Sequence, residues 1–313
     1  MKVDQITDPR FGSWYEGSAR ARIAGLLDEM SFVEFLGPQE RVMSPHLRQF
    51  NLTCEFDDGI VVGRGTLEGA DVYIAAQEGR FMGGSFGEVH GAKVVGLLRS
   101  AHEGAGGGGP RTVLLALDTG GVRLQEANVG ELAVSEVINA ILDIRLAGVA
   151  VIALVGGSAG VFGGGGIIAA SCSRVAISEQ GRISVSGPEV IENNKGVEEF
   201  DSKDRALVWR VTGGRTRTLL GGADQYVKDE IVSFREAAIS LMKMPSPFSP
   251  ESMNAEQKRL AERLQRFGDC KDAPDIWRAM QIGDADRIDD MPFEQFTAIA
   301  ANCVKKEGQS DAR

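Results

Sequence analysis

Two uninterrupted apolar runs, each leading into a glycine-rich turn, constrain the fold of this chain more than any other feature. The first run, Thr112 to Leu117, leads into Thr119-Gly120-Gly121, and the second, Val149 to Val155, leads toward Gly163 to Gly166. A short continuous apolar run is typical of a strand buried on both faces. Such strands belong to parallel sheets covered by helices, so the sequence predicts an α/β fold.

The neighbouring segments extend this pattern of strand, turn and helix. Runs at 59–67 and 72–77, joined at Glu68-Gly69-Ala70, predict a β-hairpin. Shorter strands are expected at 174–178 and 182–185, and Pro188 suits the first position of a helix. The other expected helices cover residues 91–101, 124–147, 163–172, 197–213, 229–244, 255–267 and 292–305. The repetition predicts crossover units around a mainly parallel sheet.

The chain divides into three parts by composition. Residues 1–50 are expected to be helical and irregular, residues 51–245 to form the main α/β domain, and residues 246–313 to form a helical extension packed on that domain. The proline-rich stretch Met244 to Pro250 reads as the linker before the extension.

Charge and cysteine content exclude several classes of protein. The net charge of −10 over 313 residues disfavours nucleic acid as a partner. The four cysteines are scattered without the C-x-x-C spacing of a zinc or redox site, so no metal site is expected. The opening segment has no apolar signal core and no run is long enough to span a membrane, so we expect a cytoplasmic protein.

The motifs of several enzyme classes are missing. The three histidines stand in neither a Gly-x-Ser-x-Gly nor a His-Glu-x-x-His context, which disfavours serine hydrolases and zinc peptidases. No phosphate-binding Gly-x-x-x-x-Gly-Lys motif occurs. Gly106 to Gly109 precede a strand instead of following one, so they are not a dinucleotide fingerprint.

The two glycine turns are the remaining candidates for chemistry. Both follow buried strands, and ligands of α/β sheets bind beyond the carboxyl ends of the strands. Glycine leaves backbone N–H groups accessible, and two such groups aimed at one point would form an oxyanion hole. Alternatively, the glycines only permit close packing of helices on strands.

Ordered motifs support the catalytic interpretation. The glycine run, Cys172 to Ala176, and Gly187 to Val190 resemble the signature of the crotonase superfamily. The carboxyltransferase branch is a closer match, because Phe81 to Gly87, Gly120 to Glu126, and Gly187 to Glu192 occur in order at similar separations. The resemblance covers roughly residues 50 to 245 and implies a spiral of ββα units with mainly parallel sheets flanked by helices.

The resemblance also implies a site. The first oxyanion donor is expected at the Val122 N–H, after Gly121, and the second at Gly164, with Gly163 or Gly165 as alternatives. The residues expected to line the substrate pocket are Gly83, Gly84, Ser85, Gly120, Arg123 and Phe162. For Arg123 a structural salt bridge is the alternative to a substrate contact. His90 is a candidate proton donor, and Arg215, Arg217 and Lys228 are candidate phosphate contacts or a solvated face.

Departures from the family pattern limit the reactions that this chain is expected to catalyse. The first glutamate of crotonase hydratases is replaced by Ile167 or Ile168, so hydratase chemistry is not expected. Glu189 holds the position of the second glutamate, with a helix N-terminal carboxylate as the alternative role. Cys172-Ser173 stands where the family has Cys-Asp and is expected to be structural.

Within the branch, the chain resembles the β-subunit family of biotin-independent malonate decarboxylases, because it has one carboxyltransferase half and no paired C-x-x-C zinc ribbon. The resemblance implies decarboxylation of a malonyl thioester to an acetyl thioester. It implies no intrinsic cofactor and no biotin on this chain. The substrate would be attached to an acyl-carrier protein through a phosphopantetheine-type arm that is derived from dephospho-CoA.

The same resemblance implies a homologous γ carboxyltransferase subunit and an acyltransferase subunit as further partners. Two alternatives stay open. One is a carboxyltransferase β subunit of a biotin-dependent acyl-CoA carboxylase, and the other is a non-catalytic subunit that docks an acyl carrier. Met242-Lys243-Met244 matches a biotin-attachment tripeptide, but it follows a helix and precedes Pro245, so we discount it.

Overall fold

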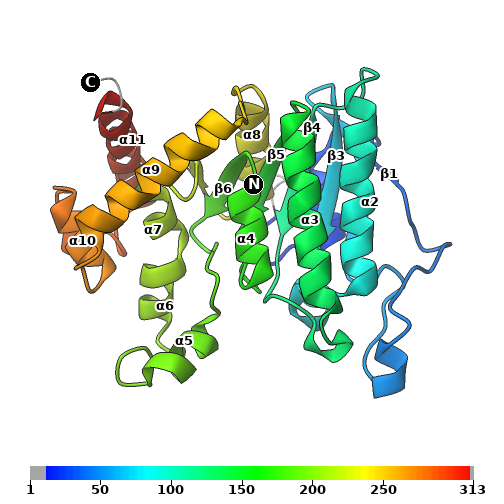
Figure 1. The fold of residues 1–313 in the computed structure, drawn as a ribbon, viewed down its shortest axis with the longest axis horizontal. Helices are drawn as coiled ribbons and strands as arrows, with labels where there is room; N and C mark the ends of the chain where they lie inside the picture. Colours follow the sequence, from blue (N-terminus) through cyan, green and yellow to red (C-terminus); the bar gives the residue numbers. More distant parts are fainter. Residues whose placement is uncertain (1–11, 311–313) are drawn as a thin grey trace, which may run out of the picture.

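A single seven-stranded sheet organises the chain (Figure 1). The computed structural model describes the backbone of residues 12–310 and the side chains of residues 12–303. The strands lie in sequence order, and the sheet is parallel from β3 onward. They are β1 (Val33–Glu34), β2 (Ile60–Leu67), β3 (Ala70–Gln77), β4 (Thr112–Leu117), β5 (Ala150–Val155), β6 (Arg174–Ser178) and β7 (Gln225–Val227). The predicted α/β class is confirmed.

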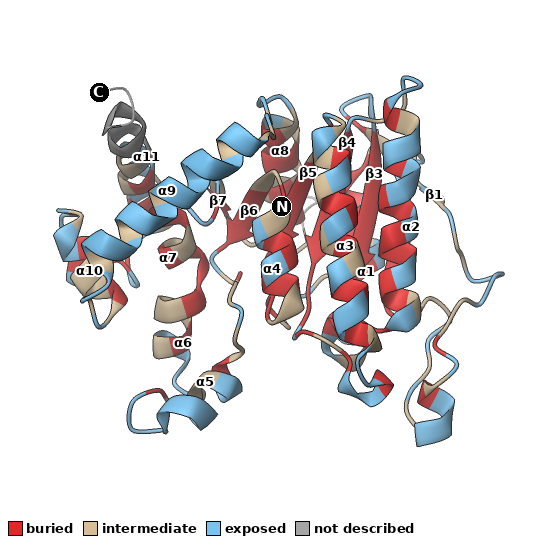
Figure 2. Ribbon diagram, in the orientation of Figure 1, coloured by how far each residue is buried: buried red, intermediate tan, exposed pale blue. Residues whose placement is uncertain are grey.

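Helices cover both faces of this sheet, as Figures 1 and 2 show. On one face α2 (Glu88–Ala105), α3 (Val129–Leu146) and α4 (Gly164–Ser171) share a core with Val113 and Leu115. On the other, α1 (Ala19–Leu26) and α8 (Ile231–Met242) pack on Leu114 and Ala116. Because successive strand residues point to opposite faces, a continuous apolar run is what a sheet covered on both sides requires.

The predicted hairpin is confirmed. β2 and β3 pair antiparallel, with Leu67 opposite Ala70. The two residues between them have positive φ, 52° for Glu68 and 76° for Gly69. Two positive φ values in a two-residue loop are the pattern of a type I′ turn, whose twist matches that of the strands.

The strand predicted at 182–185 is not a full strand. Its residues form isolated bridges, Val161 with Ile183 and Arg182 with Gly213. Two more parallel bridges, Phe86 with Val122 and Thr119 with Val161, follow the ends of earlier strands. The second strand expected in each ββα unit is therefore reduced to a short bridged segment beneath the main sheet.

The helix predicted from Leu124 starts later than expected. A short 3₁₀ turn covers Leu124–Glu126, and α3 begins only at Val129. Between them Ala127 has φ 52° and ψ −136°, which interrupts the helix. After the break the Glu126 carboxylate accepts from Ser44 Oγ and from the Glu88 N–H, so tertiary contacts override the helical pattern.

The C-terminal half contains elements that the sequence pattern partly missed. The helix expected at 197–213 begins only at residue 205, and β7, α7 and α10 were not expected, nor was β1 in the N-terminal half. Besides α4 and α8, the helices of this half are α5 (Pro188–Lys195), α6 (Arg205–Thr212), α7 (Gly214–Leu219), α9 (Pro250–Phe267), α10 (Ala273–Ala279) and α11 (Phe293–Ser310). Pro188 stands at the start of α5, as predicted.

The extension after residue 245 joins the main core through its last helices. Trp277 of α10 and Phe296 of α11 are buried in the same cluster as β4 and β5. Phe248 of the linker stacks 4.0 Å from the Arg145 guanidinium of α3. The division into three parts stays a prediction. Among the described residues, every helix is too short or too polar to cross a bilayer.

Candidate functional site

The two glycine turns are fastened to each other at the carboxyl ends of β4 and β5. The Thr119 N–H donates to Gly160 O at 2.6 Å, and the Phe162 N–H donates to Thr119 O at 2.9 Å. A Cβ placed on Gly163 would lie 3.3 Å from Gly121 Cα. The structure therefore brings the two predicted turns together, at a distance where a side chain on Gly163 would make a tight contact.

In the first turn one backbone donor is left over. The N–H groups of Gly120 and Gly121 donate to Gly83 O at 2.8 Å and to Thr119 Oγ1 at 3.1 Å. Thr119 and Arg123 also donate to backbone oxygens. Among the described residues, Val122 has no acceptor for its N–H. Val122 is half-buried, so its unbonded N–H can be reached by a ligand.

The second turn also has one such donor. Gly163 and Gly165 donate to Val185 O and Phe162 O, both at 3.0 Å. Within the part of the chain that the structure describes, every N–H from Ala159 to Gly166 has a protein acceptor except that of Gly164. Gly164 opens α4, where the helix dipole favours negative charge. This accounting favours Gly164 over its two neighbours as the second predicted donor.

The bend at Gly83 and Gly84 lies directly against the first turn. Both glycines have φ 65°. A Cβ on Gly84 would approach Asp118 O to 1.7 Å, so this position admits glycine alone. A Cβ on Gly83 would meet nothing within 4 Å, which leaves open space beside this residue.

Asp118, the last residue before the first turn, anchors the second turn. Its carboxylate is 1% exposed and accepts from the Ala159 N–H at 2.8 Å and from Arg22 of α1 at 2.9 Å. Its own N–H donates to Gln77 Oε1 at 2.9 Å. Burial raises the pKa of the Asp118 carboxyl, and the Arg22 guanidinium opposes that rise.

Arg123 lies inside the protein and is held by acidic groups. Its guanidinium is 2.9 Å from the Asp58 carboxylate and 3.4 Å from that of Glu126, all fully buried. It also donates to Ser85 O at 3.2 Å, and Ser44 donates to Glu126 through a short hydrogen bond. Burial raises the pKa of Asp58, against the effect of Arg123. The geometry favours the salt-bridge alternative for Arg123 over a substrate contact.

Two other candidates are also committed to internal contacts. Ser85 is 8% exposed, and its Oγ accepts from Arg123 at 3.4 Å. His90 is fully buried, with its ring nitrogens 3.1 Å from Gln77 Nε2 and from Asp58 O. Burial, reinforced by the charge of Arg123, lowers the pKa of His90 to about 3. A buried neutral imidazole of this kind is not a suitable proton donor to a substrate.

The remaining candidates lie apart from the turns or below the surface. Phe162 is 4% exposed, with its ring 5.7 Å from the Arg182 guanidinium. Arg215 donates to Ile288 O and Met291 O, and Lys228 pairs with Glu294 at 3.2 Å. Arg217 donates to Val211 O. Arg215 and Arg217 therefore bind backbone carbonyls and Lys228 binds a carboxylate, and a phosphate contact by these residues stays a prediction.

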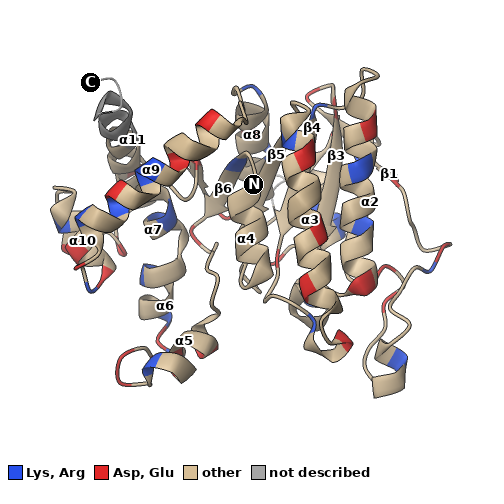
Figure 3. Ribbon diagram, viewed as in Figure 1, with Lys and Arg blue, Asp and Glu red and all other residues tan. Residues whose placement is uncertain are grey.

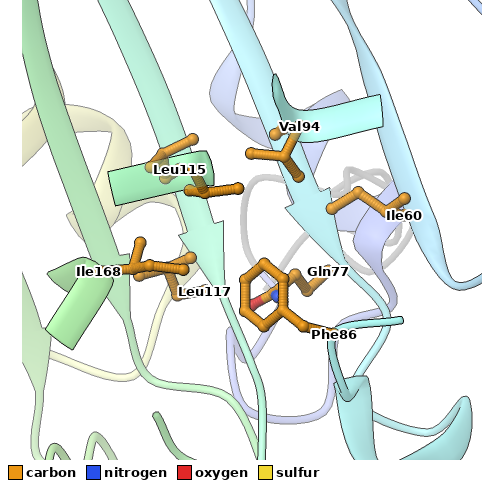
Figure 4. Close-up of a pocket in the computed structure, with 9 residues that line it drawn as sticks. Ile60, Gln77, Phe86, Val94, Leu115, Leu117 and Ile168 are labelled. Atoms are coloured by element: carbon orange, nitrogen blue, oxygen red, sulfur yellow. The ribbon is translucent and has the colours of Figure 1, made fainter. Parts of the chain in front are cut away.

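A small cavity lies in the core between the sheet and the covering helices (Figure 4). Its volume is about 10 Å³, which is at the lower limit for one water molecule. Gln77 and Phe86 border it, as Figure 4 shows, and Gln77 is its polar lining residue. The cavity is too small for a substrate.

Sequence reasoning missed the residues that hold the turns in place. Asp58, Asp118, Arg22 and Ser44 belong to no motif, and they lie far apart in the chain. Asp118 alone carried a signal, because it directly follows a buried strand. Contacts between distant segments are not readable from local pattern.

With this geometry established, comparison with known proteins defines the class. Residues 16–245 match the model of the carboxyl transferase domain. The chain belongs to the carboxyl transferase domain family, and the predicted branch is confirmed.

The most informative relatives act in malonate metabolism. The chain is 36% identical over 304 residues to the malonyl-S-ACP:biotin-protein carboxyltransferase of Malonomonas rubra, covering 92% of this chain and 95% of the relative. A chain of the Pseudomonas malonate decarboxylase hetero-tetramer in complex with malonate matches with a TM-score of 0.79 and 40% identity, covering 89% of this chain and all of that one. The chain is therefore similar to a malonate decarboxylase β subunit over nearly its whole length.

A second solved structure supports the same assignment. A chain of the Pseudomonas malonate decarboxylase hetero-dimer matches with a TM-score of 0.65 and 38% identity. The match covers 82% of this chain and 97% of that one. The expected fold and the expected enzyme class, carboxyl transfer or decarboxylation, are both confirmed.

Proposed function

We propose that this chain decarboxylates a malonyl thioester, carried by an acyl-carrier protein, to the acetyl thioester. One observation carries the proposal: two turns held against each other each keep one backbone N–H without a protein acceptor, at Val122 and Gly164. These are the two donors that the family resemblance implies. Malonyl-S-ACP and malonate appear in the names of the relatives given above.

The chemistry requires stabilisation of charge more than a nucleophile. When the bond between the α-carbon and the carboxylate breaks, its electron pair moves onto the thioester carbonyl, and CO₂ leaves. The N–H groups of Val122 and Gly164 bind the resulting oxyanion, with the N-terminus of α4 adding a favourable dipole. A proton then adds to the α-carbon to give the acetyl thioester. The open space beside Gly83 and the exposed Gly120 would form the approach to the oxyanion, with Gly84, Gly121 and Phe162 packed behind it.

We further propose that partner subunits complete the site. Exposed apolar side chains flank the turns: Leu124 is 76%, Ile167 43% and Val185 64% exposed. Such exposure beside a site is typical of a protein interface. The Pseudomonas relatives are a hetero-dimer and a hetero-tetramer. A homologous γ subunit fits this surface, and the acyl carrier and the acyltransferase complete the proposed assembly.

The cofactor and the location belong to the same proposal. The chain itself needs no cofactor, because the substrate arrives on a phosphopantetheine-type arm derived from dephospho-CoA. We propose a cytoplasmic protein without a nucleic-acid or membrane partner. The net charge of −10 supports the first of these exclusions.

A second candidate function is carboxyl transfer to biotin on another chain. The Malonomonas rubra relative is named for transfer from malonyl-S-ACP to a biotin protein, which favours this candidate. Both reactions pass through the same enolate, so the site described here serves either. Purified complex that releases CO₂ and acetyl thioester without a biotin protein supports decarboxylation, whereas a strict requirement for the biotin protein would favour transfer. Binding without turnover would indicate a docking subunit.

The two donors are best tested by replacing single backbone amides with esters, which removes one N–H and weakens the preceding carbonyl as an acceptor. A side chain at Gly164 is a poor test, because its Cβ would approach Val134 of α3 to 2.6 Å and disturb the packing. An ester at Val122 or at Gly164 is expected to lower kcat for malonyl-carrier decarboxylation about 10²–10³-fold. The thermal midpoint should fall only slightly, since neither N–H is bonded within the described chain and the acceptors Gly121 O and Gly163 O are weakened but not removed.

The matched control is an ester at Gly165, whose N–H donates to Phe162 O. This change removes a structural hydrogen bond and should lower the free energy of unfolding by about 1 kcal/mol. Its kcat should fall much less than that of the other two esters. Equal kcat values for all three would contradict the placement of the donors.

A further inference from the structure

Residues 118 and 119 hold both turns at once. The Asp118 carboxylate binds the Ala159 N–H through Oδ1 and Arg22 through Oδ2. Thr119 continues the connection, because its N–H and C=O bond Gly160 and Phe162 of the second turn. Its hydroxyl also accepts from the Gly121 N–H of the first turn. The relative position of the turns is therefore set by this dipeptide.

The Asp118 carboxylate has no room to adopt another position. A Cβ on Gly79 would lie 2.4 Å from it, and one on Gly157 would lie 2.1 Å from it. Both neighbours must therefore be glycine for the carboxylate to fit. Close packing of this kind transmits a displacement of Asp118 directly to the second turn.

Arg22 fixes the other side of the carboxylate. It is 1% exposed, and its Nε donates to Trp14 O at 2.9 Å. Arg22 belongs to α1, and so the N-terminal segment reaches the base of the proposed site through one buried ion pair. Two buried charges that are satisfied by each other and by backbone groups hold a single geometry.

We propose that Asp118, held by Arg22, is a positioning residue. It fixes the position of the Gly164 N–H relative to the Val122 N–H. The inference rests on the proposed oxyanion hole and deepens it. Asp118 does not touch the substrate; it acts through Ala159 and the turn that follows. Because catalysis by fixed donors is sensitive to displacements of about 1 Å, a shift of the second turn should lower kcat more than it raises KM.

Two double variants separate this role from general stabilisation. Both carry Arg22→Met, which removes the cation, and both have a neutral residue of similar size at position 118. In Arg22→Met/Asp118→Asn the side-chain oxygen still accepts from the Ala159 N–H. In Arg22→Met/Asp118→Leu it cannot. With the β–γ complex and malonyl-loaded carrier, the Leu variant is expected to have a kcat about 10²-fold below the Asn variant, with KM within about threefold.

A purely structural role would move both double variants together. Equal kcat values for the Asn and Leu variants, in folded protein, would overturn the inference. Where the Leu variant fails to fold, an ester at Ala159 removes the same hydrogen bond while leaving Asp118 and Arg22 in place. That ester is expected to show the same loss of kcat, and an unchanged kcat would overturn the inference.

The outcome is distinguishable from failure of the proposed function. Wild-type turnover and its loss in the Val122 ester test the oxyanion hole itself. If both behave as expected while the Asn and Leu variants are alike, only the positioning role fails. If the wild-type complex releases no CO₂, the proposed function fails and the positioning role falls with it.

Discussion

Two regions of the molecule differ in where their charged residues lie. One is the end of the sheet that carries the two turns, referred to below as the sheet edge, and the other is the long helix α9. At the sheet edge, the ion pairs of Arg123 with Asp58 and of Arg22 with Asp118 are almost completely buried. Helix α9 has no buried residue, and its charged residues are spread along the helix (Figures 2 and 3). Its pairs are local, such as Lys258 with Glu262.

The difference teaches what each set of charges does. Taking an ion pair out of water costs as much as the attraction returns, so the buried pairs contribute a fixed geometry more than net stability. Exposed pairs on α9 are screened by solvent and contribute little. Substitutions should therefore have large effects at the sheet edge and small effects on α9.

The largest expected effect is that of Arg123→Met. The variant leaves the buried carboxylates of Asp58 and Glu126 without their cation, which should lower the free energy of unfolding by about 3–5 kcal/mol. Urea titration followed by circular dichroism measures the loss. Adding Asp58→Asn removes one of the uncompensated charges and should restore part of the stability. If Arg123→Met lowers the free energy of unfolding by less than about 1 kcal/mol, the contrast between the buried and the exposed ion pairs is wrong.

A smaller effect is expected from acid titration of His90. Its pKa is about 3 in the folded protein and about 6.5 in the unfolded chain. Between these values the unfolded chain binds a proton that the folded protein does not, so stability falls as the pH falls below about 6.5. At about pH 4.5 the loss from this group should be about 2–3 kcal/mol.

The matched variant for this titration is His90→Asn, whose amide can still donate to Asp58 O. Stability measured from pH 7 to pH 4.5 should fall less steeply in the variant than in wild type. Identical slopes for the two proteins would show that His90 is not the group responsible.

The smallest change in the free energy of unfolding is expected for a substitution on α9. Leu264 is 73% exposed, and Leu264→Ala should change the free energy of unfolding by no more than about 0.5 kcal/mol. The same substitution at Leu114, which is 0% exposed in β4, should cost about 2–5 kcal/mol. Thermal unfolding of the two variants side by side gives the result. A large loss at Leu264 would mean that α9 packs against something that stabilises it.

Local pattern predicted the regular parts of the fold well. The run Thr112 to Leu117 matches β4 residue for residue, and the hairpin turn at Glu68 and Gly69 followed from its residues. The pattern failed where tertiary contacts override it. Leu124 to Asn128 reads as helix, yet the chain bends there, and the Glu126 carboxylate accepts from Ser44 and from the Glu88 N–H.

For the candidate site, the sequence located the two turns but not what fixes them. The glycine runs and their place after buried strands located the turns, and the family resemblance implied Val122 and Gly164 as the donors within them. The choice of Gly164 over Gly163 and Gly165 needed the hydrogen-bond partners of each N–H. The roles of Arg123, Ser85 and His90 also depended on burial, which a single sequence does not report.

The sequence by itself determined the α/β class, the two strand-end turns and the family, because apolar periodicity and ordered glycine motifs are local properties of the chain. Only the tertiary structure decided which backbone donors remain unbonded and which charges hold the turns. Those contacts join residues as distant as Arg22, Asp118 and Ala159. They arise from packing and desolvation in the folded protein, for which neighbours in sequence give no signal.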